Sequence, residues 1–212
     1  MSIDVKKFKN TDYKEILKLQ FDLLKKRQNN QIKDTLLILD HKPVITFGRN
    51  ADKNNLLYSK EKLKKENIDL VDIKRGGDIT YHGPGQIVGY TIFDIKEKSY
   101  GIKKFVYKLE QVFIDLLKNE YKVDAKRDKN HRGVWIDNKK IVAIGLSVKR
   151  GVTMHGFAFN VNTNLNHFDF IIPCGIKNKG VTSLKKMLNK NIDFKKIQNL
   201  VEKYMLNEFD CS

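Results

Sequence analysis

The chain of 212 residues contains two cysteines, which differ in their surroundings. Cys174 stands between Pro173 and Gly175, which predicts a tight turn, whereas Cys211 is penultimate and is expected to fray. A lone cysteine is commonly a small buried hydrophobic residue, but its thiolate is a strong nucleophile in the right setting. Cys174 is therefore the candidate nucleophile, with inert packing as the alternative.

A free thiol, with a pKa near ~8.5, needs a base or a positive neighbour to react well at neutral pH. The candidates for that neighbour are His82, His155 and the lysines at 139–140, and sequence spacing does not choose among them. No histidine forms a close ligand pair with either cysteine, so no metal site is predicted. A disulfide between the two cysteines is disfavoured in a reducing compartment.

Residues 75–86 combine four glycines and one proline with Arg, Thr, Tyr, His and Gln. The segment is not a phosphate loop, because no Gly-Lys-Ser/Thr follows, and it lacks the G-x-G-x-x-G dinucleotide pattern. Its composition predicts a loop with unusual backbone angles. The loop is either a generic turn-rich connection or a site whose backbone amides hold an oxyanion or a carbonyl oxygen.

A hairpin with two unlike faces is predicted from strands over residues 141–148 and 153–161, with Val148 opposite Thr153. One face is bulky, and the other carries only Ala143, Gly145, Ser147, Met154, Gly156 and Ala158. Glycine in a strand marks the close approach of another group. The bare face is thus either a slot for a thin apolar chain or a surface covered by a helix, and a register slip of one residue would exchange the faces.

Hydrophobic periodicity predicts helices near residues 11–28, 102–119 and 194–205. Strands are expected over residues 35–39, 44–47, 70–74, 86–93, 133–136, 141–148 and 153–161. This interleaving indicates an α/β (α+β) fold with a mixed β-sheet and flanking helices. No linker or repeat divides the chain, so a single domain is expected over residues 1–212.

The formal net charge is +16, and 35 of the 41 basic residues are lysines spread along the chain. Base reading and bidentate phosphate contacts favour arginine, so acidic protein partners are expected rather than nucleic acid. No apolar run approaches the roughly 20 residues that span a bilayer, and no secretory signal is recognised at the start, so neither a membrane nor a secreted protein is expected. We therefore expect a cytoplasmic protein.

Four segments together resemble the lipoyl (octanoyl) transferase family. Residues 75–86 read Arg-Gly-Gly-x-x-Thr-Tyr-His-Gly-Pro-Gly-Gln, which is similar to the family signature, and residues 140–145 and 155–161 resemble its second and third blocks. Pro173-Cys174-Gly175 resembles the fourth block, which carries the nucleophile. The blocks occur in the family's order over most of the chain.

The resemblance implies that Cys174 forms an acyl thioester and that Lys140 activates its thiol. It also implies an acyl-binding site made of Arg75, Gly76, Gly77, Asp78, Ile79, Thr80, Tyr81, His82, Ala143, Ile144, Gly145, Gly156, Phe157 and Ala158. The implied donor is octanoyl-acyl carrier protein, and the implied acceptors are lipoyl domains of 2-oxoacid dehydrogenases and the H protein of glycine cleavage. No cofactor is expected, and the implied fold is that of the biotin and lipoate ligase catalytic domains.

Two questions stay open at this level. Strand alternation puts Lys139 on the bare face, whereas the motif selects Lys140, and a β-bulge at the strand start would reconcile the two. The alternatives to a transferase are an ATP-dependent lipoate or biotin ligase of the same fold and a noncatalytic module that binds acylated carrier. The segment Pro173-Cys174-Gly175 favours the transferase, because those ligases need no nucleophilic cysteine.

Overall fold

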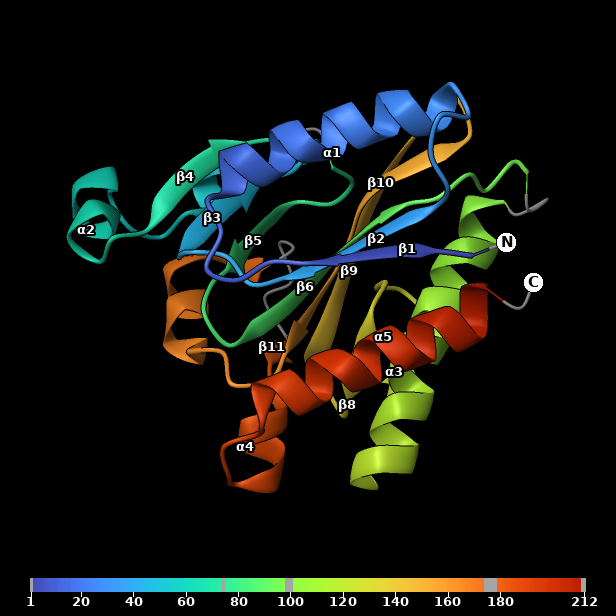
Figure 1. The fold of residues 1–212 in the computed structure, drawn as a ribbon. Coiled ribbons are helices and arrows are strands. Elements are labelled where there is room, and N and C mark those ends of the chain that lie inside the picture. Colours follow the sequence, from blue (N-terminus) through green and yellow to red (C-terminus); the bar gives the residue numbers. More distant parts are fainter. Residues whose placement is uncertain (1, 74, 98–100, 174–178, 211–212) are drawn as a thin grey trace.

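A mixed eight-stranded sheet forms the centre of the computed structural model, which describes residues 2–73, 75–97, 101–173 and 179–210 (Figure 1). The strand order is β1 (Asp4–Lys7), β2 (Thr35–Leu39), β6 (Gln86–Ile92), β10 (Val152–Asn160), β9 (Lys139–Lys149), β8 (Val134–Ile136) and β7 (Lys126–Arg127), with β11 (Gly180–Val181) paired to β9. A smaller sheet has the order β4 (Asp69–Asp72), β3 (Val44–Phe47) and β5 (Ile79–His82). The predicted mixed α/β architecture is confirmed.

Three long helices, α1 (Tyr13–Gln28), α3 (Ile102–Tyr121) and α5 (Phe194–Phe209), confirm the helices predicted from the periodicity of the sequence. The described residues also form the short helices α2 (Lys60–Lys65) and α4 (Leu184–Leu188) and the 3₁₀ turns η1 (Lys53–Asn55) and η2 (Leu165–Phe170). The Asp12 side chain caps α1 by accepting from the backbone N–H of Lys14 at 2.8 Å and of Glu15 at 3.2 Å. This cap fixes the start of α1, where Tyr13 is the first helical residue.

The large sheet separates two hydrophobic cores. Helix α1 lies on one side of the sheet, and α3 and α5 lie on the other (Figure 1). On the α1 side, Ile16 and Leu24 pack with Met154 and Ala158 of β10. On the opposite side, the aromatic and aliphatic side chains of β10 and β9 pack against α3 and α5, as Phe157, Phe159 and Val142 do. Alternation along the strands therefore divides the hairpin as predicted.

The β9–β10 hairpin has the predicted register. Val148 pairs with Thr153, Gly145 with Gly156 and Ala143 with Ala158. The other predicted strands also form, and their ends differ from the predicted ones by at most two residues. Lys74, the predicted end of one strand, lies outside the described residues. The hairpin thus presents its small residues on the side of α1 and its bulky residues toward α3.

Part of the glycine-rich segment differs from the predicted loop, because Ile79–His82 forms strand β5. This strand pairs antiparallel with β3, with Thr80 opposite Thr46 and His82 opposite Val44. All four residues of β5 are buried. A run of β-branched and aromatic residues suits a pleated surface, and here that local preference outweighs the flanking glycines. The three-stranded sheet consequently carries signature residues into the interior.

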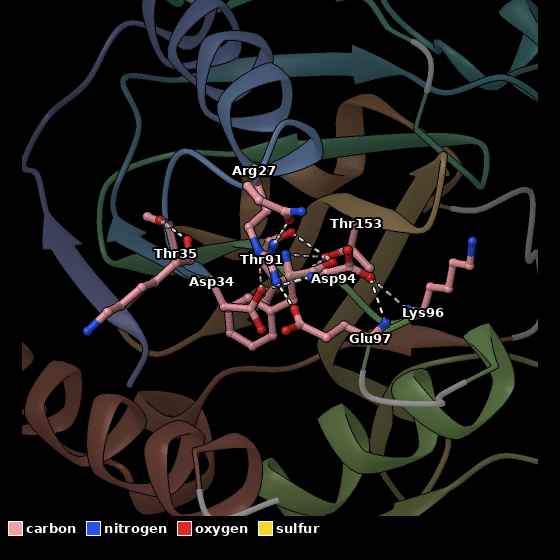
Figure 2. Close-up of polar contacts among 11 residues, drawn as sticks. Arg27, Asp34, Thr35, Thr91, Asp94, Lys96, Glu97 and Thr153 are labelled. Carbon is pink, nitrogen blue, oxygen red and sulfur yellow. Dashed lines mark hydrogen bonds and ion pairs between the residues drawn. The ribbon is translucent and has the colours of Figure 1, made fainter. Parts of the chain in front are cut away.

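A buried polar network fixes the C-terminal end of α1 against the sheet (Figure 2). Arg27 donates from Nε to Asp34 at 2.9 Å and pairs with Glu97 through Nη2, while Asp34 also accepts from the backbone N–H of Asp94 at 2.8 Å. Burial alone would lower the pKa of Arg27, but these hydrogen bonds raise it overall. Loss of one partner from a buried ion pair costs about 3–5 kcal/mol. The network therefore holds the helix that carries Tyr13.

Candidate active site

The predicted acyl-binding segments converge on one cavity, which lies between the β9–β10 hairpin and strand β5. Lys140 lines this cavity together with most of the predicted acyl-binding residues, namely Arg75, Gly76, Gly77, Asp78, Thr80, His82, Ala143, Ile144, Gly145, Gly156, Phe157 and Ala158. Residues from three separate segments of the chain are thus brought to one place. The hairpin supplies small and apolar groups, and residues 75–82 supply most of the polar ones.

Ile79 and Tyr81 do not line the cavity. Their side chains project from the other side of β5 and pack in a separate apolar cluster that includes Phe168 and Ile171. The Tyr81 hydroxyl is hydrogen-bonded to His167 Nδ1 at 2.7 Å, and burial raises the pKa of Tyr81. Because side chains alternate along a strand, only Thr80 and His82 can face the cavity from β5. Within residues 75–82, the side chains of Ile79 and Tyr81 therefore lie outside the cavity.

The segment Arg75–Gly77 covers the small-residue face of the hairpin. The Arg75 guanidinium is buried and donates to the backbone oxygen and the hydroxyl of Thr46, at 2.9 and 3.0 Å. The Gly76 N–H donates to the Leu146 carbonyl at 3.1 Å, which ties the segment to β9. A Cβ added at Gly145 would lie 3.1 Å from the Gly76 oxygen. Gly145 thus accommodates the polar loop, whereas Met154 and Ala158 of the same face pack against helix α1.

Lys140 lies on the cavity wall in a largely buried position. Its side chain is 9% exposed, whereas Lys139 is exposed to solvent. The Lys140 ammonium lies 4.8 Å from the centroid of the Trp135 ring, within the range of a cation–π contact. The indole Nε1–H donates to the His131 carbonyl at 3.0 Å, which fixes the ring. The amine is therefore held by a side chain that is itself anchored.

A β-bulge explains why Lys140, and not Lys139, reaches the cavity. Strand β8 pairs Val134 with Val142 but pairs Trp135 with Lys140, so one step on β8 corresponds to two steps on β9. The extra residue is Ile141, and it reverses the alternation for the residues before it. The irregularity that would reconcile motif and alternation is present.

Cys174 lies outside the described residues, as does Cys211. Described residues on both sides of Cys174 are hydrogen-bonded to the site. On the N-terminal side, the Ile172 N–H donates to the Asn55 carbonyl at 2.8 Å, and Asn55 Nδ2 donates to Asp78 at 2.6 Å. On the C-terminal side, strand β11 pairs with β9, and the Thr182 N–H donates to the Lys140 carbonyl at 3.0 Å.

The two histidines that could have activated the thiol are buried and neutral. Burial is the main cause that lowers the pKa of His82 and of His155, each to about 3, and the nearby Arg75 charge adds to both shifts. His82 Nδ1 is hydrogen-bonded to Gln86 Oε1 at 2.8 Å. At neutral pH neither ring supplies a positive charge to a thiolate, which leaves Lys140 as the stronger candidate among those that the sequence suggested.

Comparison with known proteins agrees with this geometry. The family model described as the lipoyl protein ligase A/B catalytic domain matches residues 12–206. The octanoyltransferase of Caldicellulosiruptor saccharolyticus is 53% identical over 96% of this chain and 87% of its own length. The octanoyltransferase of Desulforamulus reducens is 47% identical over 99% of this chain and 92% of its own. The chain belongs to the octanoyltransferase family. It is an acyltransferase of lipoate metabolism.

Solved structures show that the octanoyltransferase shares its fold with lipoate ligases. A lipoate-bound crystal structure of LipL1 from P. falciparum matches 99% of this chain and 63% of that one, with a TM-score of 0.76 and 16% identity. Ta0514 from T. acidophilum, a putative lipoate protein ligase with bound lipoic acid, matches 98% of this chain and 85% of that one, with a TM-score of 0.71 and 13% identity. At such identities the likeness concerns the fold alone.

Three cavity residues of the octanoyltransferase are absent from the predicted site: Tyr13 of α1, Tyr90 of β6 and His155 of β10. Tyr13 and Tyr90 follow ordinary core patterns, so no sequence signal marks them. His155 was a candidate for thiol activation, and it directly precedes the Gly156–Ala158 segment. The position of His155 within a largely apolar strand was the sequence feature that could have identified it as a cavity residue.

Gly156 of the octanoyltransferase has a structural role that the sequence did not indicate. A Cβ at this position would lie 2.1 Å from the Gly89 carbonyl oxygen of the neighbouring strand β6. The preceding residue, His155, has a φ of 63°, which turns the chain locally out of regular strand geometry. A larger side chain at Gly156 would therefore collide with the backbone of the sheet before it could obstruct a ligand.

Among the described residues of the octanoyltransferase, no group of three or more His, Cys, Asp or Glu side chains is arranged to hold a metal ion. Within the same residues, no helix is long and apolar enough to cross a membrane.

Proposed function

We propose that this octanoyltransferase takes its acyl group from octanoyl-acyl carrier protein, holds it as a thioester on Cys174 and passes it to a lysine of an acceptor protein. The acceptors would be lipoyl domains of 2-oxoacid dehydrogenases and the H protein of glycine cleavage. Cys174 is the nucleophile, Lys140 is the base, and the cavity holds the acyl chain.

The chemistry balances without ATP. The Cys174 sulfur attacks the donor carbonyl carbon, and the carrier thiol leaves with the proton that Lys140 took from Cys174. One thioester replaces another in this step, so it is nearly neutral in energy. The acceptor amine then attacks the acyl-enzyme, an amide forms, and the Cys174 thiol is regenerated with a proton relayed by Lys140. Two successive half-reactions let donor and acceptor use one site in turn.

The observation that carries the proposal is the location of Lys140. This amine lies on the wall of a cavity lined by three of the four family segments. Its strand also pairs with β11, which follows the fourth segment in the chain. The link from Ile172 through Asn55 to Asp78 joins the other flank of that segment to the same cavity. Both links support a thiol within reach of the Lys140 amine.

Intact mass measurement tests the proposal directly. Enzyme mixed with octanoyl-acyl carrier protein should gain one octanoyl group, which hydroxylamine removes and which peptide mapping finds on Cys174. Cys174→Ser should abolish transfer to an acceptor protein, while Cys211→Ser should leave it nearly unchanged. Acylation of Cys211, or transfer that requires ATP and free octanoate, would refute the proposal and favour the ligase alternative.

A further inference from the structure

A cluster of polar rings forms one part of the cavity wall, in contrast to the apolar hairpin. We call Tyr13, His41, His82, Tyr90 and His155 the ring cluster. Neighbouring ring centroids lie 5.0 Å apart for Tyr13 and His41, 5.9 Å for His41 and Tyr90, and 6.3 Å for Tyr90 and His155. Four of the five rings line the cavity, and His41 supports them from behind.

Hydrogen bonds hold the ring cluster in place. His41 Nε2 is joined to the Tyr90 hydroxyl at 2.7 Å, and His41 Nδ1 is joined to the Thr11 hydroxyl at 2.9 Å. Tyr13 and Tyr90 share a further side-chain hydrogen bond. Burial lowers the pKa of His41 to about 4 and raises that of Tyr13 to about 12. The rings of Tyr13, His41 and Tyr90 are thus polar, uncharged at neutral pH and unable to swing aside without loss of hydrogen bonds.

His155 is the member of the ring cluster with unused hydrogen-bonding capacity. The residue is 3% exposed, and its Nδ1 is buried without a hydrogen-bond partner among the described residues. Its backbone N–H donates to Gln20 Oε1 at 3.0 Å, and its φ of 63° is uncommon for a residue with a side chain. Strained backbone that persists at a cavity is a frequent feature of functional positions.

Two members of the ring cluster, Tyr90 and His155, lie at a distance from Lys140 along the strands of the sheet. Tyr90 of β6 pairs with Gly156 of β10, and Gly156 in turn pairs with Gly145 of β9. Gly145 follows Lys140 by five residues, or about 16 Å along a strand. Three covalent bonds of an extended backbone span about 3.8 Å. At the same spacing, the seven C–C bonds of an extended eight-carbon chain span about 9 Å. The bulge at Ile141 shortens the interval between Lys140 and Gly145, and the Lys140 side chain and the rings occupy part of it. The space left between them suits a thioester near Lys140 and a chain of medium length.

We propose that the ring cluster, with His155 at its tip, is the end stop that limits the length of the acyl chain. This inference rests on the proposed use of the cavity for the acyl group. An octanoyl chain ends before the rings and contacts only the apolar hairpin residues, such as Ala143, Ile144 and Ala158. A longer alkyl chain must displace hydrogen-bonded rings and press its methyl end against His155 Nδ1. Displacing these rings breaks their hydrogen bonds and leaves buried polar atoms unpaired, which weakens binding by roughly 5- to 150-fold.

Two substitutions at His155 test the end stop. Glycine and asparagine both tolerate a positive φ, so His155→Gly and His155→Asn keep the backbone conformation. We would measure dissociation constants for octanoate and dodecanoate, together with transfer rates from the corresponding acyl carrier thioesters. In His155→Gly, which removes the ring, the preference for octanoyl over dodecanoyl should fall by at least about tenfold. His155→Asn, which keeps a polar group, should show a smaller fall.

A matched control and a second variant keep the test decisive. His167 is also hydrogen-bonded to a tyrosine hydroxyl but does not line the cavity, so His167→Asn should leave the chain-length preference unchanged. If the His155 variants fail to fold, Tyr90→Phe should weaken the preference, because it removes the hydroxyl that holds His41. An unchanged preference in folded His155→Gly or, in its place, in folded Tyr90→Phe would overturn the end stop. If the wild-type protein formed no acyl-enzyme with octanoyl-acyl carrier protein, the proposed function itself would be refuted.

Discussion

Trp135 pairs with Lys140 across β8 and β9, one residue out of the register in which Val134 pairs with Val142. This offset brings Lys140 to the cavity side, where its ammonium lies 4.8 Å from the centroid of the Trp135 ring. A single bulged residue, Ile141, therefore determines which of two adjacent lysines belongs to the site. Bulges are common near active sites because they redirect a side chain without ending the strand.

Substitution of the two lysines should give opposite results. Lys140→Ala should reduce the rate of acyl transfer by about 10²- to 10⁴-fold, the usual contribution of a positioned acid–base group. It should also slow the alkylation of Cys174 by iodoacetamide at neutral pH. Lys139→Ala, which changes an exposed side chain, should alter both rates by less than about twofold. If Lys139→Ala transferred acyl groups more slowly than Lys140→Ala, Lys139 would be the catalytic amine and the bulge would not determine which lysine acts.

The two paired glycines of the hairpin should respond differently to alanine. Gly156→Ala puts a methyl group 2.1 Å from the Gly89 oxygen, so it should destabilise the fold by about 1–3 kcal/mol and lower the Tm by roughly 2–12 °C. Gly145→Ala meets the Gly76 oxygen at 3.1 Å, so the loop can yield slightly, and the main effect should be weaker octanoate binding. Thermal melting and calorimetric titration separate the two effects. Equal melting temperatures would contradict this assignment.

Asn55 should position the flank of the segment that carries Cys174. Asn55→Asp brings a second carboxylate next to Asp78, at a position where the present hydrogen bond is 2.6 Å long. Repulsion should slow acylation of Cys174 by about tenfold at pH 7.5, and lowering the pH to about 5.5 should restore part of the rate relative to wild type, because one carboxyl can then keep its proton. The exposed neighbour provides the control, since Asn54→Asp should have little effect. A pH-independent loss would indicate a general folding defect instead.

The buried histidines should make the protein sensitive to acid. In the folded state the pKa of His82 and of His155 is lowered from 6.5 to about 3, so folding favours their neutral forms. This contribution is complete above pH 6.5 and is lost as the pH falls from about 6.5 toward 3, because the unfolded chain takes up protons first. Urea unfolding at pH 7, 6, 5 and 4 should therefore show a falling free energy of unfolding.

A variant can assign the acid sensitivity to a particular ring. His82→Gln should flatten the decline in unfolding free energy between pH 6.5 and 4, because it removes one group that binds a proton on unfolding. His167→Gln should flatten it less, since His167, whose pKa burial also lowers, is partly exposed to solvent. A decline of the same steepness in His82→Gln and wild type would show that other groups control acid unfolding.

The sequence by itself determined seven of the strands, the long helices and the register of the β9–β10 hairpin. These features depend on alternation, helical periodicity and loop length, which are local properties. The family resemblance rested on the same linear information, and it identified the segments that line the cavity. Within those segments, strand alternation also explains why Ile79 and Tyr81 point away, although the glycine-rich composition had suggested a loop.

The tertiary structure alone decided how those segments meet. The bulge at Ile141 depends on pairing between two strands, and the role of Gly156 depends on the backbone of a third strand, so neither can be derived from one segment. Tyr13 and Tyr90 entered the cavity through packing of α1 and β6 against the hairpin. The burial that keeps His82 and His155 uncharged likewise arises only when distant elements exclude water from the rings.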